Sequence, residues 1–168
     1  IGTEVAKRAV PFGMKVIYFC RHPNPADDAA YGVQSVSMEE LLKESDYVVA
    51  AVPLTDQTFH LFNEERIAQM KAGSVLINIA RGPVVDEEAL AQALASGHLG
   101  GCAVDVFPKE PCTNSVLTRY ANALLTPHSA TSTAENSKAT NFAAANNLVN
   151  YLKKDIDAKY VVVQGTRY

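Results

Sequence analysis

Short apolar runs alternate along the chain with longer segments whose apolar residues recur at helical spacing. Runs rich in β-branched residues and bounded by Gly or Pro predict buried strands at 15–20, 46–52, 74–79, 101–106 and 123–126. Helices are predicted at 6–10 (the end of a helix), 37–44, 63–70, 86–96 and 133–152. Ser37 and Glu40 form a capping box at the start of one helix, and Asp86 caps another.

This alternation predicts right-handed βαβ crossovers, and therefore an α/β fold with a doubly wound parallel sheet of the Rossmann-like type. We assign residues 1–132 to the domain that contains this sheet. Residues 133–168 form a C-terminal helix and tail. Within that tail the apolar run at 161–163 predicts an extended edge or a docking segment.

Composition excludes several classes of protein. Of 168 residues, 48% are hydrophobic and 20% charged, which is typical of a soluble globular chain. The 15 basic and 18 acidic residues give a net charge of −3, which argues against a nucleic-acid partner held by charge. No apolar run approaches the roughly 20 residues that span a membrane. Cys20, Cys102 and Cys112 are too few and too unevenly spaced for a disulfide framework or a metal site, so we expect a cytoplasmic protein without metal.

Three chemically capable side chains follow predicted strands, where ligands bind in such sheets. Arg81 precedes a rigid Gly-Pro turn, and its forked donors suit a carboxylate. Glu110 lies between two prolines, and His128 can exchange a proton near neutral pH. Each alone is better explained without a function: Arg81 as a surface ion pair, Glu110 as a solvated carboxylate and His128 as a structural or exposed histidine. Together they predict one crevice that binds an anion and moves a proton.

The motifs after the strands resemble the D-isomer-specific 2-hydroxyacid dehydrogenase family, and within it the glyoxylate/hydroxypyruvate reductases. The matching strings are AVPLT (51–55), INIARGPVVD (77–86), GCAVDVF (101–107), EP (110–111) and LTPH (125–128). The resemblance covers about residues 1–150. It implies that residues 1–132 are an incomplete NAD(P)-binding domain and that the helix and tail at 133–168 would return to a substrate domain. It implies an oxidoreductase that transfers a hydride between a nicotinamide cofactor and a small 2-oxo or 2-hydroxy acid such as glyoxylate or hydroxypyruvate. It also implies a homodimer of the full-length protein.

The resemblance assigns roles to single residues. Arg81 would bind the carboxylate and carbonyl of the substrate, and His128 would exchange a proton with the carbonyl oxygen. Glu110 would pair with His128 and raise its pKa; a Glu here also disfavours the formate dehydrogenase branch, which has Gln. Asp105 would orient the carboxamide of the nicotinamide. The cofactor-binding residues implied are Ile1, Gly2, Cys20, Arg21, His22, Val52, Pro53, Thr58, Ile79, Ala80, Asp105 and Ser129.

The residues after the first predicted strand depart from the family pattern. Cys20 stands where a carboxylate would select NAD, and Arg21 follows it. A neutral residue beside a guanidinium favours the 2′-phosphate of NADP(H), while NAD(H) stays open. The alternative is that Arg21 extends into solvent.

The start of the sequence is the second departure. Gly2 matches the third glycine of the phosphate-binding fingerprint, so we expect a fragment without its first strand and without a substrate domain. Such a fragment would expose strand edges, and alone would neither bind cofactor tightly nor turn over. Two other hypotheses stay open: an NAD(H)-sensing, corepressor-like binding module, and an inactive fragment. The apolar stripe of the helix at 86–96 is interpreted as core packing rather than a dimer contact.

Overall fold

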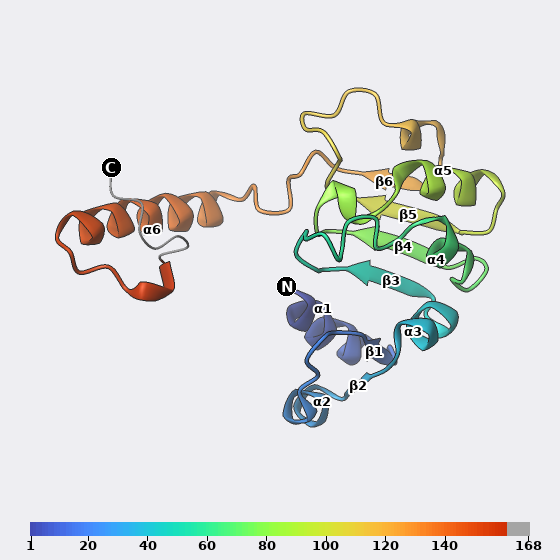
Figure 1. The fold of residues 1–168 in the computed structure, drawn as a ribbon, viewed down its shortest axis with the longest axis horizontal. Helices are drawn as coiled ribbons and strands as arrows, with labels where there is room; N and C mark the ends of the chain where they lie inside the picture. Colours follow the sequence, from blue (N-terminus) through green and yellow to red (C-terminus); the bar gives the residue numbers. More distant parts are fainter. Residues whose placement is uncertain (161–168) are drawn as a thin grey trace. The chain divides into compact units, whose positions relative to one another are not determined.

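The structure is a computed structural model that describes residues 1–160, except for the side chain of residue 27 (Figure 1). The run predicted at 161–163 therefore lies outside the described residues. The chain divides into two units, Ile1–His128 and Ser129–Tyr168. Each unit is described by itself.

The strands of the first unit are all parallel to their neighbours, which confirms the predicted α/β fold. A two-stranded sheet pairs β1 (Val16–Tyr18) with β2 (Val33–Ser35). A four-stranded sheet follows the order β3 (Tyr47–Ala50), β4 (Val75–Asn78), β5 (Gly101–Val104) and β6 (Ala123–Leu125). Strand β2 was not predicted, because three residues with a polar centre form no apolar run.

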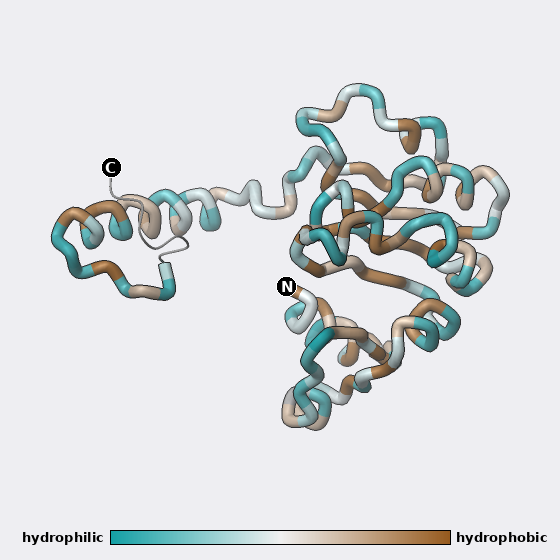
Figure 2. The backbone as a smooth tube through the Cα atoms, viewed as in Figure 1, coloured by the Kyte–Doolittle hydropathy of each residue, from teal (hydrophilic) through white to brown (hydrophobic). Residues whose placement is uncertain are grey.

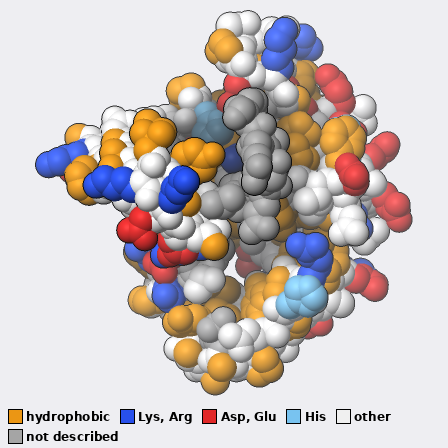
Figure 3. All heavy atoms as spheres, turned by 60° about the vertical axis from the view of Figure 1, so that its left-hand side comes forward, with side chains coloured by type: hydrophobic (Ala, Val, Ile, Leu, Met, Phe, Trp, Pro, Cys, Tyr) orange, Lys and Arg blue, Asp and Glu red, His pale blue; other side chains and the backbone are white. Residues whose placement is uncertain are grey.

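Strands β1 and β3 each have one free edge, since no backbone pairing joins the two sheets within residues 1–160. This agrees with the expected exposed strand edges. Apolar side chains also lie at the surface of the part that contains α1 and β1, at the lower end of the view in Figure 3. The large apolar side chains of residues 1–20 that are exposed are Ile1, Val5, Phe12, Met14 and Phe19.

Helices connect the strands of the first unit. They are α1 (Gly2–Ala9), α2 (Pro25–Tyr31), α3 (Met38–Glu44), α4 (Glu64–Ala68) and α5 (Glu87–Ala95), with short 3₁₀ turns η1 (Val10–Phe12), η2 (Gly82–Val84) and η3 (Val116–Arg119). The predicted N-caps Ser37 and Asp86 are confirmed: the Ser37 hydroxyl accepts from the Glu40 N–H at 3.1 Å, which is one half of the predicted capping box, and Asp86 Oδ1 accepts from two N–H groups of α5. Helix α2 was not predicted; it is short and begins after the cap Asn24.

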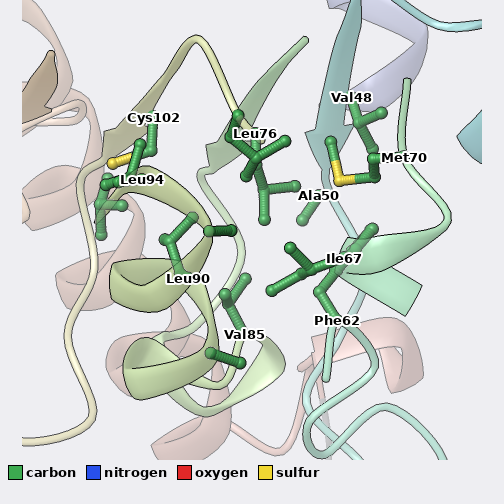
Figure 4. Packing of buried hydrophobic residues seen from close by; sticks show 14 of the residues in the cluster. Val48, Ala50, Phe62, Ile67, Met70, Leu76, Val85, Leu90, Leu94 and Cys102 are labelled. Carbon is green, nitrogen blue, oxygen red and sulfur yellow. The ribbon is translucent and has the colours of Figure 1, made fainter. Parts of the chain in front are cut away.

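The core lies between the four-stranded sheet and helices α4 and α5 (Figure 4). Leu76 of β4, Ile67 of α4 and Leu90 of α5 are almost fully buried. The stripe of α5 belongs to this core, so its interpretation as core packing is confirmed. Apolar residues accordingly concentrate in the strands of this sheet (Figure 2). Because helix and sheet bury each other, the carboxyl ends of β4, β5 and β6 are held on a rigid base.

The second unit contains α6 (Ala134–Leu152) and the 3₁₀ turn η4 (Ala158–Tyr160). Thr133 caps α6 by accepting from the Asn136 N–H at 3.1 Å, as the predicted start at 133 requires. None of the side chains of α6 is buried, and Phe142, Leu148 and Leu152 are well exposed. In the described part of the chain, no helix is both long and apolar enough to cross a membrane.

Candidate active site

Glu110 and His128 form a hydrogen-bonded pair. His128 Nδ1 lies 2.7 Å from Glu110 Oε2, and the Phe107 N–H donates to Glu110 Oε1 at 2.9 Å. The hydrogen bond from His128 lowers the pKa of Glu110 below its ordinary value of 4.5, and the Phe107 N–H and the nearby Arg81 charge lower it further. Glu110 is therefore an ionised carboxylate near neutral pH. Because Nδ1 is engaged, Nε2 is the ring nitrogen that remains for a ligand.

Arg81 lies in the turn that follows β4. The buried side chain of Asn78, 1% exposed, shapes this turn: its Nδ2 donates to the Arg81 carbonyl at 3.1 Å, and its Oδ1 accepts from the Ala80 N–H at 3.0 Å. The Arg81 side chain is exposed, and its Nη1 donates to the Ala80 carbonyl at 2.7 Å. The strand end thus presents a cation from a fixed backbone.

Gly82 brings the Arg81 turn against the loop that carries Glu110. The backbone of Gly82 packs so tightly on Phe107 and Pro108 that no side-chain carbon fits between them. This contact explains how the Arg81 charge reaches the Glu110 carboxylate. The structure therefore gathers Arg81, Glu110 and His128, which follow β4, β5 and β6, at one edge of the sheet.

Asp105 is the first residue after β5 and is only 8% exposed. Its Oδ1 accepts from the Thr126 hydroxyl at 2.5 Å, and its N–H donates to the Asn78 carbonyl at 3.2 Å. Thr126 in turn accepts the His128 N–H at 3.0 Å on its own carbonyl. His128 has a φ of 52°, a left-handed conformation that is uncommon outside glycine and is concentrated at functional sites.

The other predicted cofactor residues lie at the ends of β3 and β4. Val52 and Pro53 follow β3 in a loop closed by Thr58, whose hydroxyl donates to the Pro53 carbonyl at 2.6 Å. Since the Thr58 hydroxyl also accepts from the Thr55 N–H, it is engaged within its own loop. Ile79 and Ala80 follow β4 and are half-buried and buried.

A second group of predicted cofactor residues lies in the part with the two-stranded sheet. Cys20, Arg21 and His22 follow β1 and are exposed. Ile1 and Gly2 begin α1, where a Cβ on Gly2 would lie 3.7 Å from the Ala51 Cβ just beyond β3. Ser129 belongs to the second unit, so the structure does not place it relative to the other site residues.

Residues 1–130 match the family described as D-isomer specific 2-hydroxyacid dehydrogenase, NAD binding domain. The chain belongs to this family. The glyoxylate reductase of Pyrococcus furiosus is 41% identical to it over 156 residues, which cover 93% of the chain and 46% of that protein. For Thermococcus litoralis glyoxylate reductase the identity is 40% over 161 residues, covering 96% of the chain and 49% of that protein.

Solved structures of family members share the fold of this dehydrogenase domain. A glyoxylate reductase from Paecilomyes thermophila superposes with a TM-score of 0.84 at 39% identity, covering 92% of the chain and 47% of that protein. A D-lactate dehydrogenase from Aquifex aeolicus, complexed with NAD and lactic acid, has a TM-score of 0.85 at 34% identity, covering 92% and 51%. The chain thus spans about half the length of the relatives it matches.

Three residues of this dehydrogenase domain were missed from the sequence: Asn78, Gly82 and Thr126. Each had a local signal, since Asn78 is a polar residue inside an apolar run and all three lie within strings already quoted. The contacts of Gly82 and Thr126 join neighbouring strand ends, and the Asn78 side chain binds the turn beyond its own strand. The local signal alone could not show these roles. Within residues 1–160, no cluster of three or more His, Cys, Asp or Glu could hold a metal ion.

Proposed function

We propose that the chain is the cofactor domain of an enzyme that reduces a small 2-oxo acid of the glyoxylate or hydroxypyruvate class with a nicotinamide cofactor, or catalyses the reverse oxidation. One observation carries the proposal: a cation, an ionised carboxylate and an imidazole lie together after β4, β5 and β6. The names of the Pyrococcus and Thermococcus relatives support the substrate class. A homodimer and a cytoplasmic location stay predictions from the sequence.

The residues at the end of β5 fit a nicotinamide. Asp105 offers a buried carboxylate, which only accepts hydrogen bonds and so complements the carboxamide NH₂ group. When bound, the nicotinamide supplies or takes up the hydride and its electron pair at C4. We assign the orientation of that ring to Asp105, while the loop after β3, with the half-buried Val52 and the exposed Pro53, would line the adenosine.

The remaining steps belong to the chain's own side chains. The Arg81 guanidinium would bind the substrate carboxylate with paired hydrogen bonds. His128 would give a proton from Nε2 to the carbonyl oxygen during reduction and take it back during oxidation. Glu110, held by the Phe107 N–H, fixes the imidazole through Nδ1, and its negative charge offsets the positive charge of the ring.

Cofactor selectivity would reside after β1. Cys20 and Arg21 are exposed there. The Arg21 guanidinium could bind a 2′-phosphate, and the neutral Cys20 would not repel it. This supports NADP(H) as the favoured cofactor. NAD(H) is the alternative, because the family is described as NAD binding and one solved relative carries NAD.

The test is a graft of the chain into Pyrococcus furiosus glyoxylate reductase, replacing the 156 matched residues, so that the relative supplies its other half. We expect reduction of glyoxylate, followed at the nicotinamide absorbance. The graft with Arg81→Leu should lose this activity while it still binds cofactor. A folded graft that binds NADH without reducing glyoxylate would instead favour the corepressor-like binding module, and one that does neither would favour an inactive fragment.

A further inference from the structure

We propose that Thr126 is a positioning residue for the cofactor: its hydroxyl holds the Asp105 carboxylate in the orientation that binds the nicotinamide amide. The proposal deepens the proposed function and rests on it, since it assumes that Asp105 contacts the nicotinamide.

The hydrogen bond between the two side chains joins neighbouring strand ends that are 21 residues apart. Thr126 Oγ1 lies 2.5 Å from Asp105 Oδ1. A carboxylate can only accept, so the hydroxyl is the donor and its proton is directed at Oδ1. A hydroxyl bound to a charged acceptor forms one of the shorter and stronger hydrogen bonds in proteins. The bond therefore restrains rotation of the Asp105 carboxylate about its last torsion.

The backbone of Thr126 is itself fixed from both sides. Its N–H donates to the Val104 carbonyl of β5 at 3.0 Å, and its carbonyl accepts the His128 N–H at 3.0 Å. The hydroxyl thus reaches Asp105 from a backbone that is paired to the same strand that Asp105 follows. Thr126 therefore contacts both Asp105, which is assigned to nicotinamide binding, and His128, which is assigned to proton transfer.

A purely structural role is the competing explanation, because a buried carboxylate is stabilised by any donor. Thr126→Val keeps the shape of the side chain and both backbone bonds and removes only the hydroxyl. Thr126→Ser keeps the hydroxyl. Both explanations predict that the Val variant is less stable, but only positioning predicts that the loss of binding is confined to the nicotinamide end of the cofactor.

The experiment compares NADH with ADP-ribose, which lacks the nicotinamide. Binding of each is measured by NMR titration of the full 168-residue chain, a method that also quantifies weak binding, and by calorimetry on the graft described above. We expect Thr126→Val to weaken NADH binding by about 5- to 20-fold, a fraction of what loss of a charge-assisted hydrogen bond costs. ADP-ribose binding should change less than about twofold, and Thr126→Ser should restore NADH binding to within about threefold.

Other outcomes overturn the inference in distinguishable ways. Equal weakening of NADH and ADP-ribose by Thr126→Val shows a structural role. Unchanged binding of both shows that the hydroxyl is dispensable. If the unmodified chain and the unmodified graft bind neither these two molecules nor NADPH, the proposed function itself has failed and the inference falls with it.

Discussion

Gly82 packs directly on the peptide group between Phe107 and Pro108, so that a Cβ atom on Gly82 would overlap this backbone. The contact joins the turn that carries Arg81 to the loop that carries Glu110. The approach of these two segments is possible only because residue 82 has no side chain. The spacing of the anion-binding and proton-handling groups is therefore set by a glycine that has no chemistry of its own.

Replacing Gly82 by Ala tests this contact. The methyl group meets backbone rather than a movable side chain, so one of the two segments must shift. We expect the free energy of unfolding to fall by about 1–3 kcal/mol, as for other overpacked sites, measured by urea denaturation of the 168-residue chain. Gly2→Ala is the control, because its Cβ would lie at an ordinary 3.7 Å from Ala51. Equal stability of the two variants would contradict the assigned contact.

The pKa of Glu110 tests the pairing with His128. Since the hydrogen bond from His128 is the main cause of the lowered value, His128→Asn should return the pKa toward 4.5. Asn is too short to replace the imidazole and tolerates the left-handed backbone. Carboxyl-carbon NMR titration of the 168-residue chain measures the shift. Glu39 is an internal control, because Lys43 lowers its pKa and should continue to do so.

The same shift has a consequence for stability. A carboxyl group whose pKa is lower in the folded state stabilises that state above its ordinary pKa. The contribution of Glu110 is thus fully present above pH 4.5 and is lost as the pH falls through the lowered value. His128→Asn should remove most of this pH dependence, and a titration of Glu110 that is unchanged in the variant would refute the pairing.

Most of the fold was predictable because its signals are local. The apolar run at 46–52 contains β3, and the Asp86 cap begins α5. Strand β2 could not be predicted, because it has no apolar run of its own and forms only by pairing with β1. Helix α2 was not predicted either, since its seven residues include two aspartates and form no clear apolar stripe.

The candidate site divides in the same way. Arg81, Glu110 and His128 could be proposed from their positions after strands, because parallel strands bring their carboxyl ends to one edge. The roles of Asn78 and Thr126 could not be predicted, because they depend on which neighbouring group each side chain contacts. The Asn78 side chain binds the turn beyond its own strand, and Thr126 binds a carboxylate 21 residues away.

Substitutions of Asp86 test how helix α5 is held beneath the sheet that carries the site. The Asp86 carboxylate accepts from the N–H groups of Glu88 and Ala89 at 3.1 and 3.2 Å and so begins α5, which packs beneath the sheet. Asp86→Ala should lower the free energy of unfolding by about 1 kcal/mol, and Asp86→Asn by much less, because Asn caps helices about as well as Asp. Thermal denaturation measures both. Equal losses of stability in the two variants would assign the effect to the negative charge of Asp86, which lies 3.6 Å from His60 Nδ1.

Arg21 tests the choice between the two cofactors. In the grafted enzyme, Arg21→Ala should raise the KM for NADPH by about 10- to 100-fold, which is the usual worth of a hydrogen bond between charged groups. The KM for NADH should hardly change, because the 2′-hydroxyl carries no charge. Arg119→Ala removes an exposed arginine from η3 and is the matched control. An unchanged preference would mean that Arg21 extends into solvent.

His128 tests the chemical step itself. With the imidazole replaced in His128→Asn, no group at this position can give a proton to the carbonyl oxygen, while Asp105 and the loop after β3 are untouched. Turnover of glyoxylate by the graft should therefore fall by about 10²- to 10⁴-fold, and the dissociation constant of NADH should stay within about threefold. His98→Asn is the control, since His98 binds the Ile67 carbonyl away from the site. A fall in cofactor affinity that accounts for the whole loss would move His128 from proton transfer to binding.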